Sequence, residues 1–132
     1  GMFQGSQFNG DISEWNVSNV EYMGALFRGS KFNGDISKWD VSSVESMYEM
    51  FAYSHFNGDI SEWNVSKVGH MRRMFHGSQF NGDISKWVIK SEDMDIINYQ
   101  KDCVARIKLE SLRKFIDQKS PTTYLYSNET NW

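Results

Sequence analysis

The sequence predicts a repeat solenoid of the α/β class, in which every coil carries one short parallel strand and one helix. Three observations support this: a ten-residue segment occurs four times, its copies are evenly spaced, and each copy passes from strand-like to helix-like spacing of apolar residues. The segment FNGDISEWNV starts at Phe8, and its near-copies start 24 residues apart at Phe32, Phe56 and Phe80. A constant period in this range is the signature of a repeat array, because one unit can bury its apolar face only against its neighbours.

The predicted strand follows from the apolar spacing inside one copy. Between Ile12 and Val20 the sequence reads I-x-x-W-x-V-x-x-V, the spacing that leucine-rich repeats write as L-x-x-L-x-L-x-x-N. We place the strand over residues 14–17, with Trp15 and Val17 pointing inward by the two-residue alternation of a strand. The preceding Asn-Gly pair favours a positive φ and therefore a tight turn. The expected coil is thus leucine-rich-repeat-like.

The predicted helix follows each strand. Ser18 and Glu21 match the S-x-x-E capping box, in which the two side chains satisfy backbone donors at a helix start. Ser42 and Glu45 repeat the motif in the next copy. Apolar residues at the spacing of one helix face follow the cap: Val20, Met23 and Phe27.

Residues with the same period would close these helices. Gly29 takes the left-handed cap position, as Gly5 and Gly77 do in their own copies. Tyr53 stands at this position in the second full copy, where a positive φ would cost up to about 1 kcal/mol. We therefore expect Tyr53 to be strained if its backbone is left-handed.

The combined repeat resembles a known family. The run V-x-x-M-x-x-M/L-F-x-x-x-x-x-F-N-G-D-I-S-x-W-N/D-V-S is similar to a bacterial surface-protein repeat of about 25 residues, related to BspA-like leucine-rich repeats. That repeat is found in lipoproteins and wall-anchored proteins, and the resemblance covers residues 2–90. It implies a right-handed solenoid with an exposed adhesive or protein-binding role, and it implies no enzymatic activity.

Three segments are predicted along the chain. Residues 1–90 form the solenoid of about four units, whose first unit is truncated, since Met2 is equivalent to Met50. Repeats removed upstream of Met2 and a native start at Met2 both remain open. Residues 91–118 are predicted as a helical cap, one bent helix or two helices over the last repeat, in which Tyr99 keeps the place of Phe75 one period on. Residues 119–132 form a C-terminal tail.

Composition narrows the function classes. The chain has 132 residues, a net charge of -3 and one cysteine, Cys103. It therefore lacks the basic field of a nucleic-acid-binding protein and cannot form an intramolecular disulfide. No apolar run is long enough to span a membrane, and the chain as given contains no secretory signal. We expect no nucleic acid and no membrane span.

The repeated aspartates are the candidate metal ligands. They follow the Asn-Gly pair in every copy and would stack as a carboxylate column that could hold calcium: Asp11, Asp35, Asp59 and Asp83. The interpretation we favour is that each aspartate accepts amide hydrogen bonds within its own turn, while Asn9 and its copies bond to the next coil. We expect no metal and no other cofactor.

The remaining candidates for chemistry are also better explained by the repeat. The three histidines lack the spacing and the cysteine partners of a metal site, and no Ser-His-Asp set stands outside the repeat pattern. The recurring tryptophans fall at the inward strand position and are expected in the core: Trp15, Trp39, Trp63 and Trp87.

Two faces could bind a partner. The outward strand positions form a column of alternating charge, Glu14, Lys38, Glu62 and Lys86, because parallel strands lie about 4.8 Å apart. The helix side instead carries residues that differ between copies: Tyr22, Tyr48, His70, Arg72 and Arg73. The resemblance favours the strand face, and we take as its centre Asn16, Lys38, Asp40, Glu62 and Asn64.

The predicted function is that of a non-enzymatic protein-interaction or adhesion module at a bacterial surface. The partner would be an unidentified host or surface protein, and the chain is expected to be a monomer. Two alternatives remain open: an intracellular bacterial or phage accessory protein, and a glycan- or calcium-binding module. Resemblance favours a cell-surface or secreted location, whereas a native start at Met2 would favour the cytoplasm.

Overall fold

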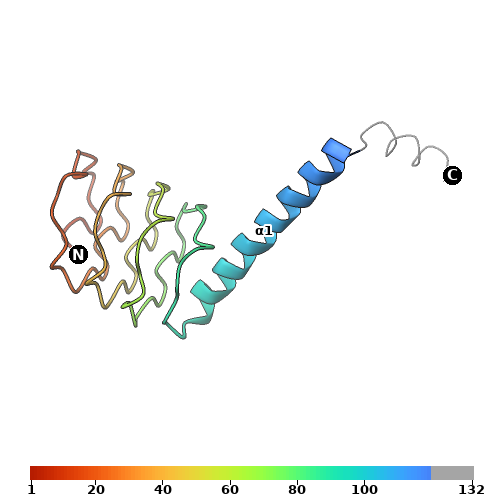
Figure 1. Cartoon of the computed structure of the whole chain (residues 1–132). Coiled ribbons are helices and arrows are strands. Elements are labelled where there is room, and N and C mark those ends of the chain that lie inside the picture. The colour runs from red at the N-terminus through yellow and green to blue at the C-terminus, as the bar shows by residue number, and fades with distance from the viewer. Residues whose placement is uncertain (120–132) are drawn as a thin grey trace.

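A computed structural model describes residues 1–119, and shows the repeats stacked as parallel coils followed by one long helix (Figure 1). This helix, α1 (Met94–Lys119), starts against the last coil and extends away from the stack. The predicted C-terminal tail lies outside the described residues, except for the backbone of Lys119.

The predicted α/β class is wrong, because the coils contain neither strands nor helices. In residues 1–119 the nearest approach to a sheet is two isolated parallel bridges, Tyr22–Ser46 and Ser46–His70. The segment expected as a strand is bent at both ends by turns. The N–H of Trp15 donates to the carbonyl of Ile12 at 3.2 Å, and the N–H of Val20 donates to that of Val17 at 2.9 Å. The leucine-rich-repeat spacing therefore marks side chains that point inward from successive turns.

Turns also replace the predicted helix, because alternate N–H groups point to the next coil. Met23 and Ala25 donate to the carbonyls of Ser46 and Tyr48 at 2.9 and 2.8 Å, and Phe27 and Gly29 continue the series. A helix would need these N–H groups for bonds within one coil. The pattern is possible because Ala25 has a φ of 55°, in the left-handed region. The intervening N–H groups of Leu26 and Arg28 bond within their own coil, to Met23 O and Ala25 O, so backbone pairing is satisfied partly between coils and partly in turns.

The left-handed positions at the end of this segment are confirmed, although they cap no helix. Gly5, Gly29 and Gly77 have φ values of 66°, 67° and 65°. Tyr53 takes the same conformation with a φ of 56°, as its position in the repeat predicts. The strain expected at this residue therefore exists in the fold.

The glycine of the Asn-Gly pair has a different role from the one predicted. Only Gly5, Gly29 and Gly77 among the described glycines have positive φ, so Gly34 forms no left-handed turn. A Cβ on Gly34 would lie 2.7 Å from Cε1 of Phe32, and the copies of this glycine meet their own phenylalanines in the same way. Glycine is required because the buried ring of Phe32 folds back over the backbone.

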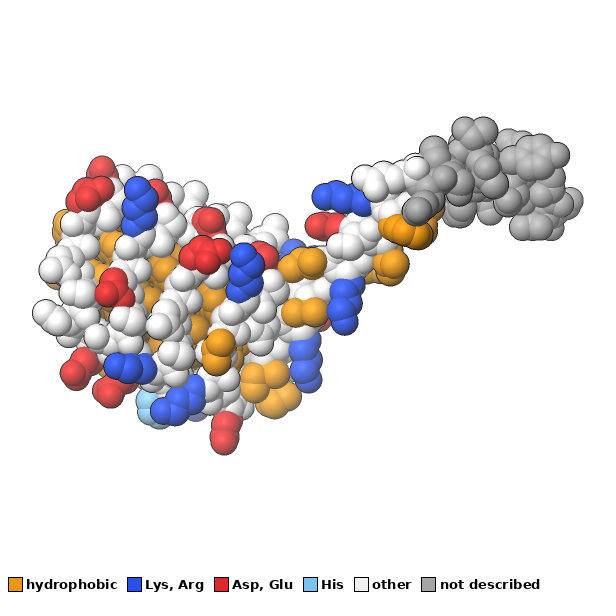
Figure 2. Space-filling model, in the orientation of Figure 1, with side chains coloured by type: hydrophobic (Ala, Val, Ile, Leu, Met, Phe, Trp, Pro, Cys, Tyr) orange, Lys and Arg blue, Asp and Glu red, His pale blue; other side chains and the backbone are white. Residues whose placement is uncertain are grey.

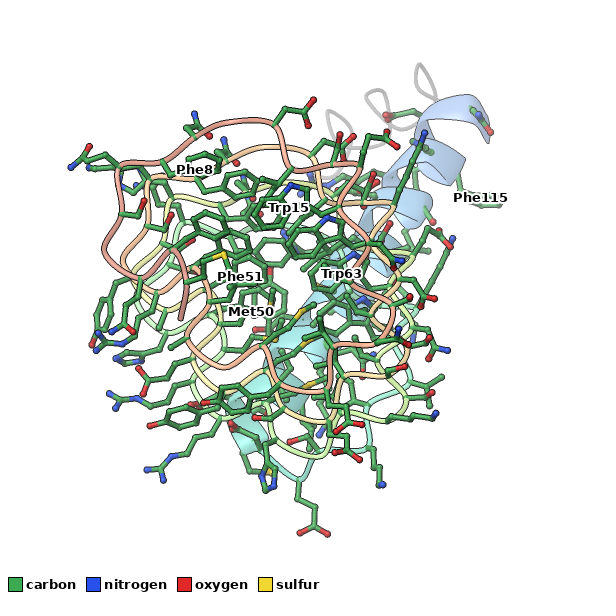
Figure 3. The ribbon with its side chains drawn as sticks, turned by 90° about the vertical axis from the view of Figure 1, so that its left-hand side faces the viewer. Phe8, Trp15, Met50, Phe51, Trp63 and Phe115 are labelled. Atoms are coloured by element: carbon green, nitrogen blue, oxygen red, sulfur yellow. The ribbon has the colours of Figure 1, made fainter. Side chains whose placement is uncertain are left out.

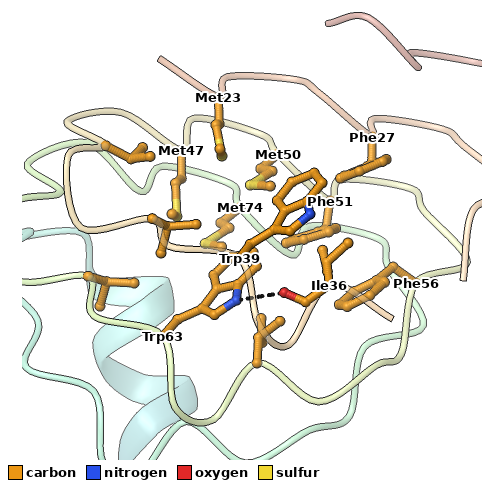
Figure 4. Packing of buried hydrophobic residues seen from close by; sticks show 14 of the residues in the cluster. Met23, Phe27, Ile36, Trp39, Met47, Met50, Phe51, Phe56, Trp63 and Met74 are labelled. Carbon is orange, nitrogen blue, oxygen red and sulfur yellow. Dashed lines mark hydrogen bonds between the residues drawn. The ribbon is translucent and has the colours of Figure 1, made fainter. Parts of the chain in front are cut away.

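The core consists of aromatic columns that run along the stack (Figure 4). Phe27, Phe51 and Phe75 stack at 5.6 and 5.8 Å between ring centroids, and Phe32, Phe56 and Phe80 form a second column. Repeated indoles bond to the preceding coil: Trp39 Nε1 donates to Ile12 O, Trp63 to Ile36 and Trp87 to Ile60, at 2.9–3.1 Å. These three tryptophans are buried as predicted, but Trp15 is 46% exposed.

Helix α1 covers the last coil and supplies the groups that a further coil would supply. The Tyr99 ring lies 5.7 Å from that of Phe75, so it continues the aromatic column as its period predicts. Gln100 Nε2 donates to Ile84 O at 3.1 Å, where another coil would place a tryptophan indole. Arg106 Nη1 donates to Asn81 Oδ1 at 3.3 Å, where another coil would place an asparagine N–H.

Only the first half of α1 serves in this way. Ile96 and Cys103 are buried against the stack, whereas the side chains of residues 105–118 are exposed. The prediction of one bent helix or two helices folded over the last repeat is therefore wrong, because one continuous helix leaves the stack (Figure 1).

Candidate binding faces

Two surfaces of the stack present polar side chains, and we name them by their backbone structure. The Asx face comprises residues 14–16, 38–40 and 62–64, which were expected on a strand. The turn ridge comprises residues 21–29, 45–53 and 69–77, which were expected on a helix. Figure 2 shows charged side chains of both signs along the margins of the stack, with hydrophobic side chains visible between the coils.

The Asn and Asp residues of the Asx face are engaged within their own turns. Asn16 Oδ1 accepts from both the N–H and the hydroxyl of Ser18, at 3.1 and 2.6 Å. Asp40 and Asn64 accept the same pair of bonds from the serines that follow them. These serines therefore stabilise Asx turns, and the capping-box interpretation of Ser18 and Ser42 is wrong. The side chains of Asn16, Asp40 and Asn64 are exposed but already bonded.

Lys38 and Glu62 are exposed on the same face without a bond to each other. Within residues 1–119, the charge column contains one ion pair, between Lys86 Nζ and Glu62 Oε1 at 3.3 Å. Both side chains of that pair are more than two-thirds exposed, at 71% and 75%, so water screens the attraction. Lys38 and Glu62 are therefore exposed to solvent, and their role in binding stays a prediction.

The aspartate column behaves as the favoured interpretation predicts. Asp11 Oδ1 accepts from the N–H and the hydroxyl of Ser13, at 2.9 and 2.7 Å, and Asp35 and Asp59 repeat both bonds. Both bonds lower the pKa of each of these carboxyls, and the bond from the serine hydroxyl has the larger effect. Asp83 accepts the N–H of Ser85, which is the main cause of its lowered pKa. Each carboxylate oxygen that bonds in this way stabilises its own coil.

The asparagine ladder is also confirmed. The N–H of Asn33 donates to Asn9 Oδ1 at 3.0 Å, and Asn57 and Asn81 each donate to the asparagine one coil before at 2.8 Å. The described residues contain no group of three or more His, Cys, Asp and Glu side chains that could hold a metal ion.

The turn ridge carries side chains that differ from coil to coil. Its exposed aromatic and basic members are Tyr22, Tyr48, Tyr53, His70, Arg72, Arg73 and His76, and it also exposes Glu21 and Glu45. Beneath them the ladder of backbone bonds is the same at both junctions between the three ridge segments, which holds the side chains at a defined height along the stack. Within residues 1–119, the side chains of Tyr22 and Arg72 make no hydrogen bond or ion pair, so both are available to a partner.

A buried carboxylate supports one part of the ridge. Glu49 is 8% exposed, and its Oε2 accepts from Arg28 Nε at 2.7 Å. Hydrogen bonds lower the pKa of Glu49: the bond from the Tyr48 hydroxyl has the largest effect, and the bond from Arg28 has the next largest. The Arg28 guanidinium also lies 5.3 Å from the centre of the Tyr53 ring, which in turn packs edge-on against His76. This cluster fixes Tyr48 and Tyr53 on the surface.

Comparison with known families places the chain in a bacterial repeat family. Residues 1–106 match the family described as "Mycoplasma protein of unknown function, DUF285". The chain belongs to this family. The match supports a bacterial repeat origin but not a BspA-like leucine-rich repeat. No curated protein and no solved structure matches the chain. Within the described part of the chain, no helix is long and apolar enough to cross a membrane.

Two groups of functional residues were missed from the sequence. Gln100 and Arg106 terminate the stack, and neither lies at a repeat position that would have marked it. Arg28 and Glu49 stand 21 residues apart, so the 24-residue period does not bring them together in an obvious way. The signal that could have found them is their departure from the consensus, since Glu49 replaces the Ala25 of the previous coil.

Proposed function

We propose that the chain is a non-enzymatic protein-binding module that docks its partner on the turn ridge, at a bacterial surface. The observation that carries the proposal is the contrast between a constant backbone ladder and variable exposed side chains on this ridge. A rigid backbone presents Tyr22, Tyr48 and Arg72 without a large loss of conformational entropy on binding. The stack is thus a scaffold, and the ridge is its recognition surface.

The ridge is preferred to the Asx face because of what the side chains already do. On the Asx face, a partner would compete with the serines for the oxygens of Asn16, Asp40 and Asn64. On the ridge, Tyr22 and Arg72 have no such internal bonds among the described residues. The predicted site on the Asx face, with Lys38 and Glu62, remains the competing hypothesis.

The chemistry of the ridge indicates the kind of partner. Tyrosine and arginine are enriched among the residues that dominate binding energy at interfaces. Arg72 and Arg73 are exposed next to each other on a chain of net charge -3, which gives a local basic site on an acidic protein. A protein that presents carboxylates beside an apolar surface fits this combination. The resemblance to surface-protein repeats supports adhesion as the biological setting.

The test is a comparison of two double variants of the full chain. Immobilised wild-type protein would capture partners from bacterial and host surface extracts. The ridge variant Tyr48→Ala with Arg72→Ala should lose at least about tenfold of the captured protein, because two hot-spot side chains are removed. The Asx-face variant Lys38→Glu with Glu62→Lys should retain it, once its melting temperature shows that it is folded. The reverse result would assign binding to the Asx face, and capture unaffected by either variant would refute both sites.

A further inference from the structure

The N-terminal end of the stack differs from every internal junction between coils. Figure 3 looks onto this end, where the side chains of Phe8 and Trp15 lie inside the outline of the first coil, at the face turned toward the viewer. Phe8 is 37% exposed, whereas its copies Phe32 and Phe56 are fully buried. Trp15 is 46% exposed, whereas Trp39 is 5% exposed. The first coil therefore leaves uncovered the side chains that form the core elsewhere in the stack.

A hollow of about 440 Å³ lies at this end. Its wall is mostly apolar and includes Phe3, Trp15, Val20, Leu26 and Trp39. The aromatic columns also stop here, because Phe3 stacks on Phe27 at 5.5 Å and Phe8 on Phe32 at 6.5 Å. An added layer of side chains would continue the columns and fill this space.

The hydrogen-bonding groups of this end form a specific pattern that matches the pattern at internal junctions. At internal junctions, an asparagine N–H, a tryptophan Nε1–H and the N–H of Glu45 or Gly69 donate to the coil before. In the first coil the equivalent donors are Asn9 N–H, Trp15 Nε1–H and Glu21 N–H, and none of them has a partner in residues 1–119. Gln7 N–H, at the position of Lys31, is a fourth such donor. The end also presents two acceptors without a partner in residues 1–119, Tyr22 O and Gly24 O, at the positions where Ser46 and Tyr48 accept from the coil before.

The downstream face of a coil carries the matching acceptors. They are the asparagine Oδ1, the isoleucine carbonyl and the carbonyl at the position of Glu21, as the junction between the first and second coils shows. A second copy of this chain does not present that face, because α1 covers it. Gln100 bonds Ile84 O and Arg106 bonds Asn81 Oδ1 in the last coil.

We propose that the N-terminal end of the stack is a docking surface for one further coil of the same 24-residue repeat, with its downstream face open. The inference continues an established interface, since the bonds and columns required are those of the internal junctions. The proposal does not depend on binding at the turn ridge.

The first experiment adds such a coil to the full chain. A copy of residues 32–49 is joined to Met2 in place of Gly1, since Met2 is equivalent to Met50. The copy carries Trp39→Phe, so that all tryptophan emission comes from the original residues. Its matched control contains the same residues in permuted order. We expect the native-order copy to raise Tm by about 5 °C or more, and the permuted copy to leave Tm unchanged.

Trp15 reports directly on the docking surface. The difference in acrylamide quenching between each chain and its Trp15→Phe variant isolates the contribution of Trp15. Quenching of Trp15 should fall at least about twofold in the native-order extension, as burial from 46% exposure requires. Equal Tm and equal quenching in the native-order and permuted extensions would overturn the proposal.

A second arm keeps the test decisive if the extended chain fails to fold. The same native-order peptide, added separately to the unextended full chain, should protect Trp15 in a saturable way, whereas the permuted peptide should not. If neither peptide protects Trp15, the proposal is refuted. Sedimentation of the unextended chain tests the competing occupant: a dimer that dissociates on Trp15→Ser would show that this end takes a second copy.

Discussion

The first coil and the coils behind it have almost the same sequence but different surroundings. Trp39 is buried and its indole bonds to Ile12 O, whereas the identical residue Trp15 is half exposed and has no coil to bond. Phe32 is fully buried between the equivalent rings of Phe8 and Phe56, while Phe8, in residues 1–119, has an equivalent ring on one side alone and is 37% exposed. The energetic role of a repeat residue is therefore set by its position in the stack and not by its identity alone.

The largest expected effect comes from turning the last coil into a second open end. Removing residues 91–132 would expose Phe80, Ile84 and Trp87 and leave Ile84 O without the Gln100 bond. We expect loss of cooperative folding or aggregation, because both ends of a short stack would then be apolar. Sedimentation and thermal melting of residues 1–90 would measure it. A soluble monomer with a cooperative transition would show that α1 is not needed as a cap.

A pair of tryptophan substitutions compares the two environments directly. Trp39→Ala should reduce the free energy of unfolding by about 3 to 5 kcal/mol, as large core truncations do. Trp15→Ala should cost well under half of that, since much of its ring already contacts water. Chemical denaturation of both variants gives the comparison. Similar losses at the two positions would mean that the first coil is packed as tightly as the second.

The repeated glycines allow a smaller version of the same test. Gly34→Ala would place a Cβ against the buried ring of Phe32, and we expect it to cost about 1 to 3 kcal/mol through overpacking. Gly10→Ala makes the same contact with Phe8, but that ring is partly exposed and free to move outward. Its effect should be the smaller one. Equal destabilisation would argue that the backbone itself, and not the ring, requires glycine.

Sequence reasoning recovered the side-chain bonds that recur every 24 residues and missed the backbone bonds between coils. The asparagine ladder and the bonds to Asp11 could be predicted from polar residues that recur at one position. Tyr53 could be matched to the position of Gly29, where a left-handed φ was predicted. The helix could not be excluded, since S-x-x-E and the apolar spacing after Ser18 fit a helix locally. The competing arrangement gains its stability from bonds between coils, such as Met23 N–H to Ser46 O, which no single repeat contains.

At the candidate site, too, the repeat period predicted which residues are equivalent but not which bonds they make. The period put Asn16, Asp40 and Asn64 on one face correctly in relation to each other, but their bonds to the following serines were not foreseen. An Asx turn and a capping box use the same serine, and the local sequence does not decide between them. The backbone bonds between coils decide it, and Ala25, Glu49 and Arg73 adopt a left-handed backbone, incompatible with a helix, to make them.

The smallest effect concerns acid stability, and the repeats contain their own control. Asp40 occupies the position of Asn16 and Asn64, and all three accept the same two bonds from a serine. Two hydrogen bonds lower the pKa of Asp40 below its ordinary value of 3.8: the bond from the Ser42 hydroxyl has the larger effect, and the bond from the Ser42 backbone N–H the smaller. The unfolded chain therefore binds more protons in acid than the folded chain. The stability that Asp40 contributes is present above its unfolded pKa and is lost as the pH falls through its folded pKa.

Asp40→Asn should consequently fold as well as the wild type at pH 7 and lose less stability as the pH falls below about 4. The asparagine accepts both bonds without titrating, as Asn16 and Asn64 do in their coils. Asn16→Asp is the matched opposite change and should steepen the pH dependence at the first coil. Denaturation midpoints between pH 7 and pH 3 would measure both slopes. Parallel slopes for all three proteins would show that these turns contribute nothing to acid lability, and would shift its cause to the Asp11 column.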